Sequence, residues 1–206
     1  MPRDATATRE RLLREAERLF ATRGVYQVTA REIHEAAGQR NASALTYHFG
    51  SREGVLTQIL LRHGNPMDVE RGRLLAELGE RADTRSLLGT LLVPYSHPLA
   101  SASGRDYLRI VAQLTDMFPD WHEEGELRPP NLRRILTVLE ERPPEVPVAI
   151  RRERVVGAIM LMTSAMAERA RLMEGRRKLE LDEPTFLGNL ADMITGVLEA
   201  PMGPPF

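Results

Sequence analysis

The apolar residues of this chain recur three and four positions apart along most of its length, which is the spacing of helices with one buried face. Between residues 8 and 24, leucine, alanine and phenylalanine form one such stripe, and Gly24 follows as a typical stop signal. Further stripes occupy residues 51–78, 84–101, 104–118, 131–141, 148–175 and 183–199. Alternation with a period of two, which marks strands, is almost absent. The pattern therefore predicts an all-α fold of about nine helices.

The stretch of residues 29–49 predicts two short helices joined by a tight turn. Its first residue, a threonine, and Glu32 have the spacing of a capping box, in which each side chain accepts a hydrogen bond from the backbone N–H group of the other residue. Val28 and Ile33 occupy the flanking positions of a hydrophobic staple, which fixes the angle at which the chain enters the helix. Gly38 supplies the left-handed residue that ends this first helix.

The second short helix places Leu45 and Phe49 on one inward face, and Asn41 or Ser43 can cap its start. The side chains that face elsewhere are small or can form hydrogen bonds, namely Ala44, Thr46, Tyr47 and His48. A short helix anchored on one face in this way suits insertion into a DNA major groove. From these residues alone, two core helices of an ordinary bundle remain the alternative.

Three groups of residues carry a resemblance to a known family: Leu19-Phe20 with Gly24, Thr29 with Ile33 and Ala36-Ala37-Gly38, and Tyr47-His48-Phe49-Gly50-Ser51-Arg52-Glu53 with Leu56. Through them, residues 8–60 resemble the DNA-binding domain of the tetracycline-repressor (TetR) family of bacterial transcription regulators. The turn Gln39-Arg40-Asn41 is one residue longer than the usual turn of the family, and Thr46 stands where many members carry tyrosine. The resemblance implies a DNA-binding domain over residues 1–50 and a helical domain for effector binding and dimerisation over residues 51–206.

The resemblance also implies which residues contact DNA. Tyr47 and His48 would contact phosphate or a thymine methyl group, and Arg40 or Asn41 would read base edges, where arginine favours guanine and asparagine favours adenine. Phosphates would be held at the starts of the neighbouring helices. The full predicted set of DNA-contacting residues is Thr29, Arg31, Arg40, Asn41, Ser43, Ala44, Thr46, Tyr47, His48 and Arg52.

Ser51 can cap the next helix, whose apolar pattern is interrupted at Gly64-Asn65-Pro66 and resumes at Met67. We predict one long helix that is bent at the proline. In the TetR family this helix connects the DNA-reading end to the rest of the protein. The bend is therefore either a hinge or a plain interruption with no mechanical role.

The last two predicted helices are the longest of the C-terminal half. The helix of residues 148–175 is apolar nearly all round between residues 155 and 166, so it requires cover on several sides. The resemblance implies that these two helices form a four-helix bundle across a two-fold axis. The predicted dimer-interface residues are Val156, Phe186, Leu187, Leu190, Ile194 and Val197. An ordinary core within one chain is the alternative.

The same part of the chain is rich in methionine, a flexible side chain that adapts to varied apolar ligands. The resemblance implies an effector pocket between the middle helices and the helix that ends near Gly175. The predicted lining residues are Tyr95, Leu108, Val111, Met117, Phe118, Trp121, Met160, Thr163 and Met166. Residue types alone also allow these side chains to form a plain core.

Composition excludes several kinds of chemistry. The chain has no cysteine, so disulfides, thiolate metal sites and cysteine catalysis are excluded. The histidines form no HExxH pattern and the serines lack a G-x-S-x-G setting. His122 with Asp116, Asp120, Glu123 and Glu124 is either a loose metal cluster or, as is commoner for such a loop, a solvated acidic segment. We predict no metal, no cofactor and no enzymatic activity.

The net charge says little about whether the chain binds nucleic acid, whereas the hydropathy pattern bears on where in the cell the protein is expected. Residues 1–63 carry ten arginines and seven acidic residues, an excess of +3 in a chain whose formal net charge is −1. The chain has no N-terminal apolar run, and no apolar stretch approaches the length that spans a membrane. We therefore expect a cytoplasmic protein with no membrane partner.

These observations lead to one functional prediction. The chain is predicted to be a homodimeric transcriptional regulator, a repressor released from a palindromic double-stranded DNA operator by a small apolar or aromatic effector. Two alternatives come from other classes, a helical dimer that acts as an interaction module without DNA and a small-molecule enzyme.

Overall fold

The computed structural model describes residues 2–39, 43–79 and 82–204, which form nine α-helices and two 3-10 helices with no strand among them. In chain order the elements are α1 (Pro2–Arg23), α2 (Ala30–Ala36), α3 (Ala44–Phe49), α4 (Arg52–Glu77), α5 (Thr84–Ser96), η1 (His97–Ala100), α6 (Ala102–Val111), η2 (Thr115–Asp120), α7 (Pro130–Glu140), α8 (Val148–Glu174) and α9 (Glu183–Glu199). The predicted all-α fold of about nine helices is confirmed.

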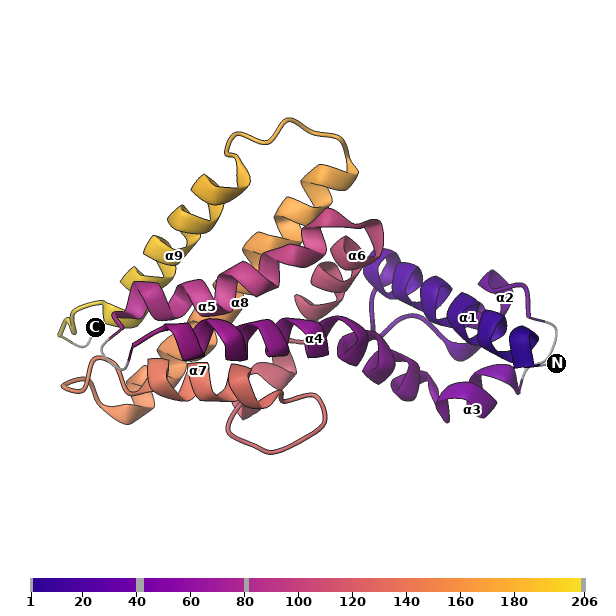
Figure 1. Cartoon of the computed structure of the whole chain (residues 1–206), viewed down its shortest axis with the longest axis horizontal. Coiled ribbons are helices and arrows are strands. Elements are labelled where there is room, and N and C mark those ends of the chain that lie inside the picture. The colour runs from indigo at the N-terminus through magenta and orange to yellow at the C-terminus, as the bar shows by residue number, and fades with distance from the viewer. Residues whose placement is uncertain (1, 40–42, 80–81, 205–206) are drawn as a thin grey trace.

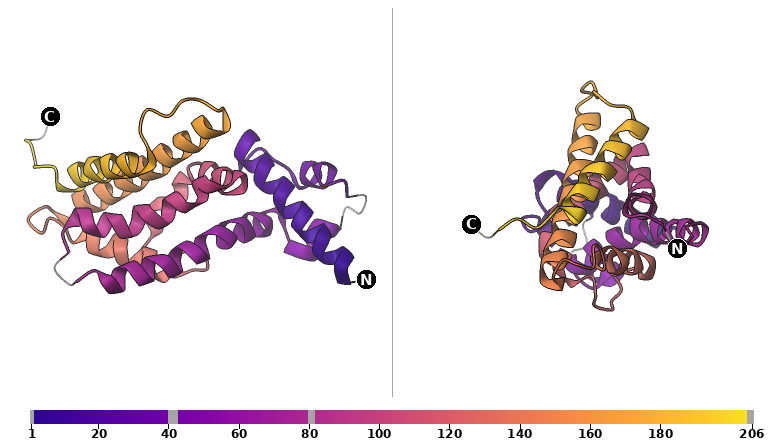
Figure 2. Two further views of the ribbon diagram at one scale, coloured as in Figure 1. Left: turned by 45° about the horizontal axis from the view of Figure 1, so that its top comes forward. Right: turned by 90° about the vertical axis from the view of Figure 1, so that its left-hand side faces the viewer.

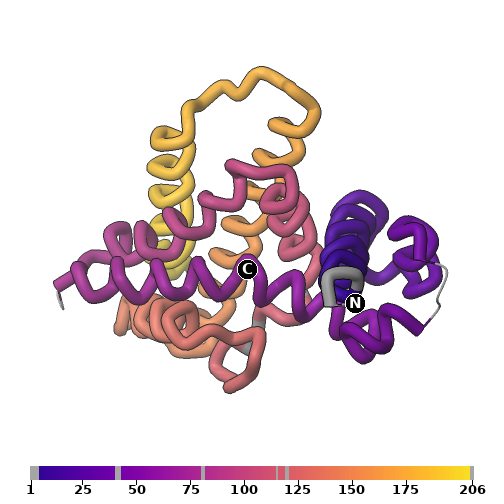
Figure 3. The backbone as a smooth tube through the Cα atoms, turned by 45° about the vertical axis from the view of Figure 1, so that its right-hand side comes forward, coloured from indigo at the N-terminus to yellow at the C-terminus, as the bar shows by residue number. Residues whose placement is uncertain are grey.

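The molecule is elongated, with α1–α3 at one end of its long axis and the bundle of α5, α7, α8 and α9 towards the other (Figure 1). α4 runs along this axis and joins the two ends, because it contacts α1 and α3 as well as α5 and α7. α1 crosses the start of α4 at the N-terminal end (Figure 2). α6 lies between α1 and α8 and contacts both, so it is a second connection between the two ends (Figure 3).

The N-terminal core is formed by the predicted stripe of α1 together with the inner faces of α2 and α3. Phe20 and Ile33 have no exposed surface, and Leu45 is 2% exposed. Val55 of α4 and Ile110 of α6 belong to the same cluster of buried residues. The apolar core of α1–α3 is therefore continuous with α4 and α6, while the predicted domain division at residue 50 stays a prediction.

α4 begins at the predicted place and passes through the predicted interruption. Ser51 Oγ accepts a hydrogen bond from the backbone N–H of Gly54 at 3.1 Å, which caps the helix start. The helix then continues through Pro66 to Glu77 as a single element, so the proline does not break it. Proline has no N–H group to donate to the carbonyl four residues earlier, which weakens the helix here without ending it. A hinge role for this point stays a prediction.

α6 is shorter than the predicted helix of residues 104–118, because it ends at Val111. The side chain of Gln113 accepts a hydrogen bond from the backbone N–H of Val25 at 2.8 Å and donates to the carbonyl of Phe20 at 3.3 Å. These bonds tie the turn after α6 to the end of α1, and the chain then continues as the 3-10 helix η2. A long-range contact thus overrides the local helical pattern.

The C-terminal core is formed by the inner faces of α5, α8 and α9, with α7 beside them. Leu88 and Met166 have no exposed surface, and Leu190, Ile194 and Leu198 of α9 are at most 2% exposed. Among the described residues, no helix combines the length and the apolar character needed to cross a membrane.

A buried polar cluster lies where α1, α4 and α6 meet. The carboxylate of Glu17, a residue that is 3% exposed, accepts a hydrogen bond from Ser103 Oγ at 2.5 Å and lies 2.7 Å from His63 Nε2. The ring of His63 stacks on the ring of Tyr107, with the centroids 4.7 Å apart. One contact chain therefore runs from α1 through α4 to α6.

Candidate nucleic-acid interface and ligand cavity

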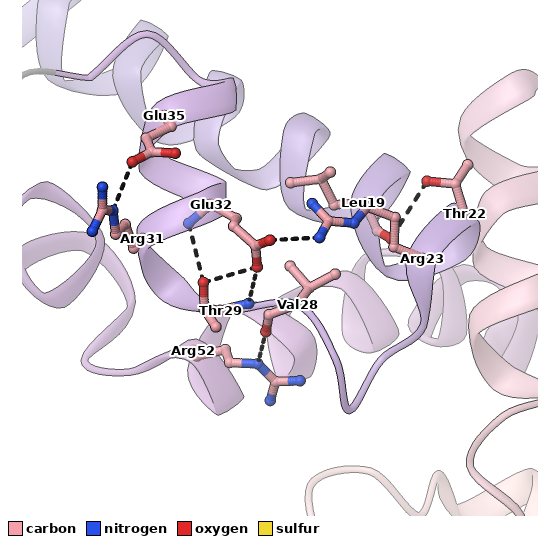
Figure 4. Close-up of polar contacts among 9 residues, drawn as sticks. All are labelled: Leu19, Thr22, Arg23, Val28, Thr29, Arg31, Glu32, Glu35 and Arg52. Carbon is pink, nitrogen blue, oxygen red and sulfur yellow. Dashed lines mark hydrogen bonds and ion pairs between the residues drawn. The ribbon is translucent and has the colours of Figure 1, made fainter.

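The start of α2 is held by the predicted capping box (Figure 4). The backbone N–H of Glu32 donates to Thr29 Oγ1 at 3.3 Å, and the backbone N–H of Thr29 donates to Glu32 Oε2 at 2.8 Å. Arg23 at the end of α1 donates to the other carboxylate oxygen of Glu32 at 2.5 Å. The bonds from Thr29 and then the guanidinium of Arg23 lower the pKa of Glu32 to about 2, so its carboxylate is ionised at neutral pH. The capping box is confirmed, and it fixes α2 on α1.

Arg52, which the sequence predicts to contact phosphate, has structural partners within the protomer, and its contact with phosphate stays a prediction. Its Nε donates to the carbonyl oxygen of Val28 at 2.6 Å, as the close-up shows (Figure 4). Its guanidinium carbon lies 5.1 Å from the centroid of the Phe20 ring, and Nη1 pairs with Glu53 at 3.0 Å. Arg52 therefore holds the start of α4 against the chain that enters α2 through Nε and Nη1, while its Nη2 has no hydrogen-bond partner among the described residues.

α3 presents the face that the sequence predicts, with one exception. Leu45 is buried and Phe49 is partly buried, so both anchor the helix, whereas Thr46 is exposed and Tyr47 is 81% exposed. His48 is half-buried, and its ring meets the Tyr47 ring edge-on at 4.9 Å. Ala44 is only 9% exposed, which corrects its place among the predicted DNA contacts, because the register of α3 turns it towards the core.

A histidine that the sequence reasoning did not use fixes α3 to α2. His34 Nε2 accepts a hydrogen bond from the backbone N–H of Leu45 at 3.0 Å, so the ring satisfies one of the donors at the start of α3. Ser43 is the N-cap residue of this helix, yet its side chain makes no capping hydrogen bond. The signal in the sequence was the polar side chain of His34 on the inner face of α2. Its partner, Leu45, is eleven residues further along the chain.

The remaining predicted DNA contacts divide into two groups. Arg31 is exposed on α2 and its Nε pairs with Glu35 at 2.7 Å. Arg40 and Asn41 lie outside the described residues. The exposed side chains of α3 thus form a small polar and aromatic surface on a helix that is fixed from behind, which is the arrangement that permits entry into a major groove.

A cavity of about 170 Å³ lies in the body of the protein, between α4, α5, α6, α7, α8 and the segment of residues 114–129. Six of the predicted lining residues lie in its wall, namely Tyr95, Val111, Met117, Phe118, Trp121 and Thr163. The other members of the wall are Leu60, Leu61, Gly64, Asn65, Arg71, Tyr107, Leu114, Glu126, Leu127, Arg128, Pro129, Leu132, Arg133, Leu136, Ile159 and Met162.

Three predicted lining residues lie outside this wall. Leu108 and Met166 have no exposed surface and belong to the C-terminal core. Met160 is 45% exposed, because it sits on the side of α8 that faces away from the protomer's core. The reasoning from sequence missed Arg71 and Tyr107, since an arginine three residues after Asp68 has the spacing of an ordinary surface ion pair.

The polar part of the cavity wall is unusual, because several of its donors have no partner within the described chain. The Nε of Arg71, the hydroxyl of Tyr95 and the indole Nε1 of Trp121 are all buried, and no described residue accepts a hydrogen bond from them. Thr163 differs, since its hydroxyl donates to the carbonyl oxygen of Ile159 at 2.8 Å. Burial raises the pKa of Tyr95 well above its usual value, so its hydroxyl stays protonated.

The predicted dimer interface needs a correction at its centre. Leu190 and Ile194 are 2% and 1% exposed within one protomer, because this face of α9 packs against α5 and α8. The surface that one protomer leaves uncovered lies on the other side of these helices. It includes Met160 of α8 and Met193 of α9, which are 45% and 47% exposed. The other predicted interface residues, Val156, Phe186, Leu187 and Val197, are partly buried.

His122 and the acidic residues near it in the loop each pair with a different residue. His122 Nε2 lies 2.7 Å from a carboxylate oxygen of Glu140, while Asp116 accepts from the hydroxyl of Tyr26 at 2.7 Å. Glu123 and Glu124 pair with arginines, Arg128 at 3.6 Å and Arg133 at 3.3 Å. Within the described part of the chain, no three histidine or acidic side chains converge as metal ligands.

An anchored short helix with an exposed front, attached through α4 and α6 to a helical body with a cavity, is the arrangement of a helix-turn-helix domain joined to a second helical domain. Residues 12–59 match the sequence profile of the family described as bacterial regulatory proteins, tetR family. The match lies in the N-terminal part of the chain, where the sequence resembles the DNA-binding domain of TetR-family regulators.

Several solved structures are similar to the chain over nearly its whole length. The fatty acid degradation regulator FadR from Bacillus halodurans is 14% identical, covers 94% of this chain and 95% of its own, and has a TM-score of 0.52, which supports the fold. GusR of Salmonella enterica is 18% identical over 93% of this chain and 95% of its own, with a TM-score of 0.45. A γ-butyrolactone receptor described as ArpA-like is 20% identical over 93% and 97%, with a TM-score of 0.43. No curated protein matches the chain by sequence.

Proposed function

We propose that the chain is a homodimeric repressor that inserts α3 into the major groove at each half of a palindromic operator and leaves the DNA when a small molecule fills the cavity. The observation that carries the proposal is the contrast on α3, where Leu45 is 2% exposed and Tyr47 is 81% exposed. A large aromatic side chain that is 81% exposed on an anchored helix contributes little to the core of the protomer. It is placed for a partner.

The partner proposed for α3 is duplex DNA. Thr46, Tyr47 and His48 supply hydroxyl, phenol and imidazole groups that can contact phosphates, base edges or a thymine methyl group. Arg31 on α2 adds a cation beside them. The short helix does not need to be stable alone, because the bond between Leu45 and His34 and the contacts of Phe49 hold it on the rest of the domain.

The proposed dimer forms through the uncovered sides of α8 and α9. Met160 and Met193 are large apolar side chains that are nearly half exposed, and Val156 and Val197 are partly exposed beside them. A Cβ added to Gly157 would lie 3.9 Å from a methyl group of Val197, so α8 and α9 are in van der Waals reach here. A two-fold axis through this face would double these contacts and would present two copies of α3 to a palindrome.

Two helices connect the cavity to the DNA-reading end. α4 contributes Leu60 and Gly64 to the cavity wall, and its first turns hold α3. α6 contributes Tyr107, whose ring stacks on His63, and His63 lies against Glu17 of α1. A ligand that displaces either helix would therefore shift α1 and α3 relative to the body. A coupling free energy of about 1–3 kcal/mol between ligand and DNA would be ordinary for such a regulator.

The test starts from duplex DNA selected out of a random pool by the full-length protein, which serves as the probe in titrations. We expect a palindromic selected site and binding that weakens as salt is raised, since phosphate contacts release counterions. Tyr47→Ala should weaken binding about tenfold or more while the protein stays dimeric and its far-UV helical signal is unchanged. Tyr26→Ala is the matched control, because Tyr26 is also exposed, at 67%, but its hydroxyl donates to Asp116 of the body.

Three results would contradict the proposal. The pool could yield no enriched duplex, which would favour an interaction module that does not bind DNA. The site could be a single asymmetric half-site, which would exclude a two-fold dimer on DNA. Tyr47→Ala could bind as tightly as the unaltered protein, in which case the exposed face of α3 is not the reading surface.

A further inference from the structure

We propose that the cavity binds a small monocarboxylic acid whose apolar body is about the size of one aromatic ring, with its carboxylate held by Arg71, Tyr95 and Trp121. The inference rests on the proposed function only for its regulatory consequence, since the binding of an acid can be measured without DNA. It assigns a chemical class of ligand to the cavity described above.

The first argument is the gathering of donors without partners in one cavity. Arg71 and Tyr95 are 3% and 2% exposed and Trp121 is 7% exposed, and all three lie in the cavity wall. They come from α4, from α5 and from the end of η2. A buried donor without an acceptor destabilises a fold, so three such donors around one cavity indicate a site that is completed by something outside the chain.

Arg71 is not satisfied by its nearest carboxylate. Asp68 lies 3.9 Å from Arg71 Nη1, which is beyond hydrogen-bond distance. Both oxygens of Asp68 are occupied at the start of α7: Oδ1 accepts from the backbone N–H of Leu132 at 2.8 Å, and Oδ2 accepts from the backbone N–H and the side-chain amide of Asn131 at 3.2 and 3.1 Å. Asp68 therefore caps α7 and does not form a hydrogen bond with Arg71, which lies in the cavity wall.

The second argument is the chemistry of the donors. Guanidinium and indole groups can only donate hydrogen bonds, and the buried phenol of Tyr95 stays protonated and can donate as well. The complementary ligand group is one that only accepts, with several lone pairs and a negative charge opposite the arginine. A carboxylate meets each of these conditions, and hydrogen bonds between arginine and carboxylate are among the stronger ones in proteins. An amine or ammonium ligand has the wrong polarity.

The other charged residues of the wall do not change this assignment. Arg128 and Arg133 pair with Glu123 and Glu124 on the loop that precedes α7. Glu126 belongs to the same loop and is exposed. These charges lie at the loop side of the cavity, whereas the three donors without partners are buried.

The third argument is the size and polarity of the remaining space. The cavity of about 170 Å³ compares with the engineered apolar cavity of roughly 150 Å³ that binds benzene. Away from the donors the wall is apolar, with Val111, Leu136, Ile159 and Met162 among its residues. One ring or a short branched chain fits this space and would extend from the bound carboxylate into the apolar part of the cavity.

The experiment is isothermal titration of the full-length protein, without DNA, with benzoate, with its neutral counterparts benzamide and methyl benzoate, and with the cation benzylamine. The expected result is binding of benzoate at neutral pH that is at least tenfold tighter than binding of either neutral compound, and no binding of benzylamine. Short branched carboxylates compared with the corresponding amides provide a second pair of probes.

Three variants locate the carboxylate. Tyr95→Phe and Trp121→Phe each remove one donor, and each should weaken benzoate binding several-fold without changing the binding of benzamide by as much. Tyr95→Phe should also raise the melting temperature of the ligand-free protein by a few degrees, because it removes a buried hydroxyl that has no partner in the chain. Arg71→Met should abolish the preference for acid over amide. If Arg71→Met fails to fold, the two phenylalanine variants still decide the question.

The matched control is Thr163→Val, which removes a hydroxyl from the same cavity wall. Because that hydroxyl already donates to the carbonyl of Ile159, its loss should leave the preference for acid over amide unchanged. Equal affinity for benzoate and benzamide, or full benzoate affinity in Tyr95→Phe and Trp121→Phe, would overturn the inference and would indicate that water alone meets these donors. An acid that binds as expected but does not release DNA would leave the inference intact and would contradict the proposed release mechanism instead.

Discussion

A single substitution on the outer side of α9 separates the proposed dimer surface from the core of the protomer. Met193 is 47% exposed within one protomer, and Met160 of α8 is 45% exposed. We predict that Met193→Arg produces a folded monomer. The control substitution is Val69→Arg, which introduces the same side chain at a residue of α4 that is 74% exposed and lies outside the proposed face.

The magnitude follows from the exposed fraction. Complete burial of a methionine side chain contributes about 1.5–3 kcal/mol, so covering the 47% that one protomer leaves exposed contributes about 1 kcal/mol. A two-fold axis uses the residue twice, which gives about 2 kcal/mol and a dimer dissociation constant about 30-fold higher after its loss. The buried charge of the new arginine adds to this figure. The free energy of unfolding of the monomer should change little, because half-exposed positions tolerate a charge.

The assay combines sedimentation across a range of protein concentrations, thermal unfolding and titration with the selected operator. Met193→Arg should sediment as a monomer, keep its helical signal and lose tight operator binding, whereas Val69→Arg should behave as the unaltered protein does. Leu190→Arg should instead fail to fold, since Leu190 is 2% exposed in the core. A Met193→Arg protein that still sediments as a dimer and binds DNA would refute the reasoning and place the interface elsewhere.

Two further predictions concern stability. Burial raises the pKa of Asp106 to about 6, with Glu17 and Glu174 adding to the rise and Arg109 opposing it. The contribution of Asp106 to folding stability is therefore complete below the ordinary pKa of 3.8 and is lost as the pH rises through 6. In urea unfolding, Asp106→Asn should therefore gain about 1–2 kcal/mol in free energy of unfolding relative to the unaltered protein as the pH rises from 4 to 7. A difference that does not vary with pH would contradict this prediction. Gly38→Ala should cost about 1 kcal/mol in thermal unfolding, because Gly38 has a φ of +62°, whereas Gly79→Ala, where the added methyl group meets nothing and φ is not positive, should be neutral or stabilising.

Local rules were enough to predict the starts of α2 and α4 and the glycine that ends α2. The capping box of Thr29 and Glu32, the cap at Ser51 and the glycine end of α2 depend on residues within a few positions of one another. Their geometry is therefore encoded in short spacings. The inward positions of Leu45 and Phe49 follow in the same way from the four-residue period of a helix.

Features that depend on distant contacts could not be predicted in this way. An apolar stripe on α9 indicates that a face is buried, but not whether it meets its own chain or a second copy, and Leu190 proved to meet its own chain. α6 ends early because Gln113 bonds to α1, nearly ninety residues away. Arg71 was overlooked because its helical spacing from Asp68 is that of an ordinary ion pair. Only the three-dimensional structure shows that the carboxylate of Asp68 accepts hydrogen bonds from the start of α7 instead.

The position of the three cavity donors also bears on how an acid would act on DNA. Arg71, Tyr95 and Trp121 belong to three different elements, so one carboxylate that bonds to all of them fixes α4 relative to α5 and η2. The other end of α4 holds α3, and Tyr107 in the same cavity wall reaches Glu17 of α1 through His63. A ligand changes an equilibrium only by as much as it prefers one conformation over the other. Suppose that the carboxylate pairs all three donors only in a conformation in which the spacing of the two copies of α3 does not fit the operator. The free energy of acid binding then favours that conformation and releases the DNA. Linkage then requires the operator to weaken acid binding by the same factor by which the acid weakens operator binding.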